Sequence, residues 1–124
     1  MFQVSGENAS LQFEVKDNGK LIVSGAFTDT SSTAEGSIVK VNDGSFGLFS
    51  NVILTGNNSS AKGAAIDCTS GQIALAGGTI TGNTGANGAV YSDSDILVQG
   101  TVIVKDNKIA DVQANVYLDK EAKF

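Results

Sequence analysis

The sequence predicts an all-β protein, a short parallel β-helix of about four to five coils. Three observations carry this prediction. A unit of 24 to 28 residues recurs along the chain, its apolar residues fall in three-residue β-rich runs, and Gly, Asn, Asp and Ser separate these runs. Proline, which would remove a backbone donor from a strand, is absent from the 124 residues. Repeats of this length are typical of solenoids, in which each unit buries its apolar face against its neighbours.

The clearest unit covers residues 75–91 and reads Leu-Ala-Gly-Gly-Thr-Ile-Thr-Gly-Asn-Thr-Gly-Ala-Asn-Gly-Ala-Val-Tyr. Its order of apolar strand, Asn, small polar residues and a final Ile or Val recurs at 52–66 and 102–117, and at 26–38 with Thr30 in the Asn position. A partial fifth unit is predicted around 9–11. The equivalent apolar positions, spaced by 27, 28, 24 and 26 residues, are Leu11, Ile38, Ile66, Val90 and Val116.

The local pattern favours strands over helices. Helical repeats need amphipathic helices of ten or more residues, but glycine interrupts most units within that distance. Runs such as 21–23, 96–98 and 102–104 are short and rich in Ile, Leu and Val, and the Leu-x-x-Leu-x-Leu-x-x-Asn frame of leucine-rich repeats is absent. The sequence therefore predicts two or three short strands per coil.

The period-two rule for strands places Leu54 and Ile80 inward, and Thr55 and Thr81 outward. An asparagine follows shortly after each of these strands, at a predicted corner, where Asn tolerates a left-handed backbone and stacked amides can hydrogen-bond from coil to coil. The residues of this predicted structural Asn ladder are Asn57, Asn83 and Asn107.

The whole chain, 1–124, is predicted to be one β-helix domain. Residues 1–16 are expected to form a partial N-terminal coil or cap, 19–118 the repeats, and 119–124 a charged C-terminal cap or tail. From 107 onward glycine is absent, and Ile109, Val112 and Val116 also fit one face of a short helix, so a strand coil and a helix both stay open for 107–124.

Composition excludes several functions. The net charge of −5 argues against binding nucleic acid through its phosphates and against an anionic membrane surface. The longest apolar run, residues 73–76, is too short to insert into a membrane. All eight basic residues are Lys, and Arg and His are absent. Cys68 is the only cysteine, which excludes an internal disulfide and favours a small buried side chain.

The segment 79–91 resembles the repeats of right-handed parallel β-helices in large bacterial cell-surface and secreted proteins. It is also similar to the repeats of polymorphic outer-membrane proteins and adhesin passengers, whose Gly-Gly-Ala-Ile element appears here at 63–66 and 88–90. Their aromatic-x-x-Asn element is replaced by Leu54-x-x-Asn57 and Ile80-x-x-Asn83. The resemblance covers about 19–118 and implies a right-handed coil and a secreted or cell-surface location, although no secretory signal is visible. Such repeats serve adhesins, glycan-binding proteins and polysaccharide-cleaving enzymes alike.

Catalysis is not expected from this chain. Lyases with this fold generally use Arg or Lys with calcium-binding carboxylates, and the hydrolases use Asp residues with His and Arg-x-Lys. The Arg and His that these sites use are missing. The carboxylates that remain as candidates for a glycosidase pair fall at different phases of the repeat. They are Asp67, Asp93, Asp95 and Asp106.

No cofactor is predicted, and two weak ligand sites remain as candidates. Asp93 and Asp95 supply oxygen ligands of the kind Ca²⁺ prefers, but Asp and Ser are also common turn residues. For a glycan, the candidates are two tyrosines one coil apart, which can stack on each other or on a sugar ring, and a Thr-x-Thr strip on an outward strand face. They are Tyr91, Tyr117, Thr79 and Thr81.

The favoured function is therefore a non-enzymatic structural or adhesive module of a bacterial surface or secreted protein, with a glycan or host-cell partner. The alternatives are a lyase- or hydrolase-related β-helix acting on acidic glycans, and an inert spacer of a longer solenoid. A homodimer or end-to-end oligomer is also expected, because so few coils leave two apolar ends with unpaired backbone groups.

Overall fold

The computed structural model describes residues 1–25, 36–119 and 122–124, and all its regular secondary structure is β. The strands stack in parallel as a β-solenoid of about three turns, which confirms the predicted all-β parallel β-helix. Within these ranges, no helix is long and apolar enough to cross a membrane. Thr30 and most of the repeat unit predicted at 26–38 lie outside the described residues.

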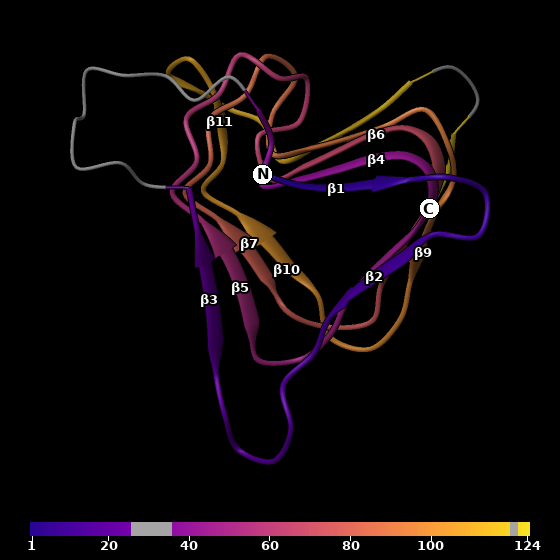
Figure 1. Ribbon diagram of the computed structural model, residues 1–124. Coiled ribbons are helices and arrows are strands. Elements are labelled where there is room, and N and C mark those ends of the chain that lie inside the picture. Colours follow the sequence, from indigo (N-terminus) through magenta and orange to yellow (C-terminus); the bar gives the residue numbers. More distant parts are fainter. Residues whose placement is uncertain (26–35, 120–121) are drawn as a thin grey trace.

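Each coil runs along three walls that enclose the core, and Figure 1 looks along the column. The first wall has the strand order β1(Phe2–Ser5), β4(Val39–Leu48), β6(Ile66–Leu75), β8(Val90–Ser92) and β13(Val116–Leu118). On the second wall, β2(Ser10–Phe13) pairs with the later half of β4, and β9(Ile96–Val98) pairs with the later half of β6. The third wall has the order β10(Ile103–Lys105), β7(Thr79–Thr81), β5(Val52–Thr55) and β3(Leu21–Ser24).

The bend between the first and second walls depends on stacked glycines. Gly44 in β4 and Gly71 in β6 have φ angles of +100° and +111°, a left-handed region that glycine adopts at least cost. A Cβ atom on Gly71 would lie 2.4 Å from the carbonyl oxygen of Gly44, so the coils can stack here only without side chains. The register between β4 and β6 shifts at the same place, between Asn42 and Ser45.

The core follows the predicted alternation. Leu54 and Ile80 point inward and are fully buried, while Thr55 and Thr81 are half-buried on the outer side of the third wall. Cys68 is a buried free cysteine that packs in the hydrophobic core, and burial raises the pKa of its thiol. A thiol of this kind is a poor nucleophile at neutral pH, which agrees with the predicted structural role.

Two details of the repeat alignment were wrong. Ile66 is in register with Val39 rather than with Ile38, and Leu11 pairs with Phe46 on the second wall. The first-wall strand of the first coil is β1, which pairs with β4 from Phe2 onward. The first coil was misaligned because Ala26 stands where the later units have their corner asparagine.

The predicted four to five coils exceed the observed three turns. The four strands of the third wall are separated by only three coil-to-coil steps. Five strands stack on the first wall and four on the third, so a count of repeat units gives more coils than a count of the steps between them.

The helix considered for 107–124 is wrong for the part up to Leu118. Two short strands, β11(Lys108–Ile109) and β12(Val112–Gln113), form an antiparallel hairpin, and β13 follows them. Ala110 turns the hairpin with a φ angle of +50°. The spacing of Ile109 and Val112 resembled that of a helix because a two-residue turn separates these two strand residues.

Candidate functional site

The outer face of the third wall carries an apolar row that crosses all four strands. Ile22, Ile53, Thr79 and Ile103 lie in register, one on each strand from β3 to β10. Ile22 and Ile103 are 55% and 43% exposed, which is unusual for large aliphatic side chains. The row therefore gives this wall an apolar surface that solvent can reach.

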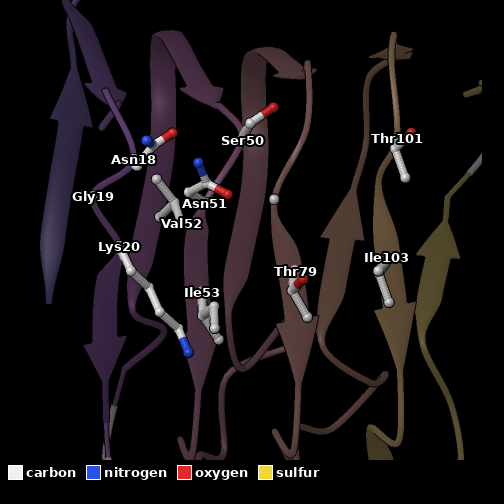
Figure 2. A pocket seen from close by; sticks show the side chains of 11 residues that line it. Asn18, Gly19, Lys20, Ser50, Asn51, Val52, Ile53, Thr79, Thr101 and Ile103 are labelled. Carbon is white, nitrogen blue, oxygen red and sulfur yellow. The ribbon is translucent and has the colours of Figure 1, made fainter. Parts of the chain in front are cut away.

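A groove of about 490 Å³ includes part of this row, because Ile53, Thr79 and Ile103 are among its lining residues. Figure 2 shows these side chains. The polar lining of the groove comes from residues that stand just before the strands of this wall. These residues are Asn18 and Lys20 before β3, Ser50 and Asn51 before β5, and Thr101 before β10. Its remaining lining residues are Gly19, Val52, Ile53, Gly78, Thr79 and Ile103.

This lining combines two chemistries. Ile53 and Ile103 supply apolar surface, and hydroxyl and amide groups offer hydrogen bonds beside it. Among the described residues that line the groove, only Lys20 carries a charge. Such a surface suits a ligand with apolar faces and polar edges, and it favours an anionic group near Lys20.

The structure separates the predicted ligand residues. Thr79 lines the groove, and Thr81 lies one row away on the same wall, in register with Thr55 and Lys105. Tyr91 and Tyr117 are on the first wall, on β8 and β13. The four residues therefore do not form one site.

The two tyrosines stack on each other. Tyr91 and Tyr117 are in register, with ring centroids 5.6 Å apart and an interplanar angle of 10°. Tyr91 is only 1% exposed, whereas Tyr117 is 42% exposed. Only Tyr117 therefore offers substantial ring surface to a ligand.

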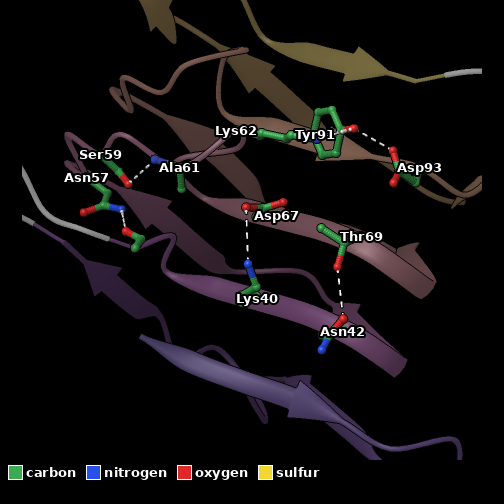
Figure 3. A network of polar contacts seen from close by, with 11 residues as sticks. Lys40, Asn42, Asn57, Ser59, Ala61, Lys62, Asp67, Thr69, Tyr91 and Asp93 are labelled. Atoms are coloured by element: carbon green, nitrogen blue, oxygen red, sulfur yellow. Dashed lines mark hydrogen bonds and ion pairs between the residues drawn. The ribbon is translucent and has the colours of Figure 1, made fainter.

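The hydroxyl group of Tyr91 is the centre of a polar cluster, part of which Figure 3 shows. Its oxygen lies 2.6 Å from Oδ1 of Asp93 and 2.7 Å from Oδ2 of Asp119, and Lys62 Nζ donates to it at 3.0 Å. Hydrogen bonds to the two carboxylates raise the pKa of Tyr91, and burial adds to this. A phenol has one proton, so the two carboxylates compete for a single donor. Lys62 also lies 4.4 Å from the ring centroid, a cation–π contact.

Asp67 lies next to this cluster, in register with Tyr91 on one side and with Lys40 on the other. Its side chain is 6% exposed, and its Oδ2 lies 3.9 Å from Lys40 Nζ (Figure 3). Among the described residues, its buried Oδ1 has no hydrogen-bond partner. Desolvation raises the pKa of this carboxyl group more than Lys40 lowers it.

The proposed calcium ligands belong to different networks. Asp93 accepts from Tyr91, whereas Oδ1 of Asp95 accepts from the backbone N–H of Lys123 at 2.8 Å. No group of three or more His, Cys, Asp or Glu in the described ranges could hold a metal ion.

The asparagines Asn57, Asn83 and Asn107 lie one above another at the corner after the third wall, and all are buried. Oδ1 of Asn83 accepts from the backbone N–H of Asn57 at 3.1 Å, and Oδ1 of Asn107 accepts from that of Asn83 at 3.0 Å. The side-chain amides of Asn83 and Asn107 also donate to carbonyl oxygens in their own coil and the preceding one. These contacts hold successive corners together.

Sequence reasoning missed three residues of these networks. Asn115 ends the Asn ladder, because its Oδ1 accepts from Nδ2 of Asn107 at 3.1 Å. A signal was present, since Asn115 stands directly before the first-wall strand, where the two preceding coils have Ala65 and Ala89. Asp119 also had a signal, because it directly follows β13 as Asp93 directly follows β8, 26 residues earlier. Lys62, which contacts Tyr91 from the segment between β5 and β6, gave none.

Comparisons with protein-family models, curated proteins and solved structures find no match to this chain.

Proposed function

We propose that this chain is a non-enzymatic β-solenoid module of a bacterial surface or secreted protein, and that the groove on its third wall binds an extended acidic glycan. The groove is the observation that carries the proposal. It lies on a rigid, parallel-paired wall and combines an apolar row with hydroxyl, amide and ammonium groups. Sugar rings present the matching apolar faces and polar edges, and Lys20 provides the charge that an acidic sugar requires.

Binding without cleavage fits the groove better than catalysis does. Glycoside hydrolysis by the common mechanism needs two carboxyl groups on either side of the bond. None of the described residues that line the groove carries a carboxyl group. Asp67 and Asp93 lie on the first wall, away from this surface.

The test is calorimetric titration of the chain with oligogalacturonate, an acidic glycan, and with cello-oligosaccharide, a neutral one. We expect binding of the acidic glycan, about tenfold weaker in Lys20→Gln, which keeps the stem and removes the charge. Lys108→Gln is the matched control, because Lys108 is exposed on the hairpin and does not line the groove.

Two results would overturn the proposal. One is equal binding by Lys20→Gln and the parent chain, or no binding of either glycan. The other is release of unsaturated sugar in the presence of Ca²⁺, detected by its ultraviolet absorbance, because that product would identify a lyase.

A further inference from the structure

The C-terminal end of the column leaves inward-facing side chains partly uncovered. Val98 is in register with Leu75, which is 2% exposed, yet Val98 is 43% exposed because no described strand stacks beyond it. The other inward-facing residues of this end are half-buried: Val102, Val104, Val116 and Leu118. This end therefore exposes the interior of the solenoid.

The N-terminal end is open in the same way. Phe2 is in register with the buried Val39 and is 46% exposed, and Leu21 is in register with the buried Val52 and is 36% exposed. Val23 is half-buried on the same edge. Both ends therefore combine exposed apolar side chains with the edges of parallel strands, which pair readily with other strands.

The two ends match each other strand by strand. Every coil-to-coil pairing between named strands on the three walls is parallel, so β13, β9 and β10 at one end have the directions that β1, β2 and β3 would need as their next partners. Continuing the observed registers places Val116 opposite Phe2, Val98 opposite Phe13 and Val104 opposite Val23. All of these are inward-facing apolar residues, and two small valines meet two bulky phenylalanine rings.

The outward-facing residues are also compatible. The same registers place Tyr117 opposite Gln3, Leu97 opposite Gln12, Ile103 opposite Ile22, and Lys105 opposite Ser24. None of these four pairs brings like charges together. The opposite end of a second copy is thus compatible with each end of this chain in strand direction, in inward-facing side chains and in charge.

We propose that copies of this chain bind head to tail, with β13, β9 and β10 of one copy extending the three walls of the next through its β1, β2 and β3. Such an interface joins two different surfaces and does not close on itself, so it produces linear chains of copies.

The C-terminal residues 122–124 act as a partial cap against this contact. The backbone N–H of Ile96 on β9 donates to the carbonyl oxygen of Lys123 at 2.7 Å, and Asp95 holds the N–H of Lys123. A second copy must displace these bonds to pair along β9. Deleting residues 122–124 should therefore strengthen association.

The experiment blocks one end at a time. Val98→Lys places a charge at the C-terminal end, and Leu21→Lys places one at the N-terminal end, both at positions that already reach solvent. We expect the parent chain to increase in mass with concentration in sedimentation equilibrium, and each variant alone to stay monomeric. An equimolar mixture of the two variants should form a one-to-one dimer and stop there, because one open end remains on each.

The matched control is Thr81→Lys, which adds the same charge to the outer face of the central strand β7 and should leave association unchanged. Circular dichroism checks that each variant is folded, and Phe2→Lys with Val104→Lys repeats the test on other strands. A parent chain that stays monomeric up to millimolar concentration overturns the proposal. Continued self-association of Val98→Lys or Leu21→Lys, or a failure of their mixture to form the dimer, also overturns it.

Discussion

Two rows of side chains run from coil to coil in this solenoid, and they are built differently. At the corner after the third wall, Asn57, Asn83 and Asn107 repeat one residue type and bond to one another. On the outer face of the first wall, the residues in register are Gln3, Lys40, Asp67, Tyr91 and Tyr117. The first row is uniform, whereas the second repeats only its last residue type, tyrosine.

This difference between the two rows distinguishes residues that the fold requires from residues that it only tolerates. At the corner the backbone leaves the strand ladder and its N–H and C=O groups are buried, and the same amide satisfies them in three successive coils. The outer face of the first wall already has its backbone groups paired between strands, so its side chains can vary without loss of the fold. A row that repeats one residue type therefore indicates a structural role, whereas a row of different residue types leaves room for a specific function.

The largest effect is expected at the Asn ladder. Asn83→Ala removes the donor to Leu54 and Thr81 and the acceptor for the N–H of Asn57, all at a fully buried position. Each buried group left without a partner costs about 1–3 kcal/mol, so we expect the free energy of unfolding to fall by more than about 3 kcal/mol. Urea denaturation followed by circular dichroism measures this loss.

The control for this change is Asn58→Ala, an exposed asparagine in the same turn region, with an expected change within about 0.5 kcal/mol. If the two variants lost similar stability, the amide contacts of the corner would not be what holds successive coils together, and the contrast between the two rows would fail.

A smaller effect is expected in the varied row. Tyr91→Phe keeps the ring that stacks on Tyr117 but removes the hydroxyl that contacts Asp93, Asp119 and Lys62. We expect a loss of about 1–2 kcal/mol in the free energy of unfolding, because the two carboxylates lose a donor at a buried position. Tyr117→Phe, at a ring that is 42% exposed, should change stability by only a few tenths of a kcal/mol. Equal losses in the two variants would show that the buried hydroxyl has no special role.

The sequence predicted what repeats. The inward and outward alternation, the corner asparagines and the equivalence of Tyr91 with Tyr117 all follow from a fixed position in a recurring unit. The fold class could be predicted for the same reason, since stacked coils impose one pattern many times.

What does not repeat could not be predicted. Lys62 reaches Tyr91 from a segment whose length differs between coils, so no spacing in the sequence places it. The groove depends on Asn18 and Lys20, in a first coil that lacks the corner asparagine used to align the others. The number of coils was also predicted too high, because a terminal strand has the sequence of a repeat but only one neighbouring strand.

The smallest expected effect concerns Asp67, and its sign depends on pH. Burial raises the pKa of this carboxyl group in the folded protein above its ordinary value of 3.8. Between the unfolded and the folded pKa the native state therefore holds more protons, so the contribution of Asp67 to stability is fully present below the unfolded pKa and is lost as the pH rises through the folded pKa. Asp67→Asn does not titrate at this position, so its stability relative to the parent chain should increase from pH 3 to pH 7, by less than the loss expected for Tyr91→Phe. Urea denaturation at the two pH values measures this, with Asp106→Asn as the control, because Asp106 forms an exposed pair with Lys105. If the stability of Asp67→Asn relative to the parent chain fell toward pH 7, the attraction between Asp67 and Lys40 would outweigh the desolvation of Asp67. The Asp67–Lys40 pair would then stabilise the solenoid, as the corner asparagines do.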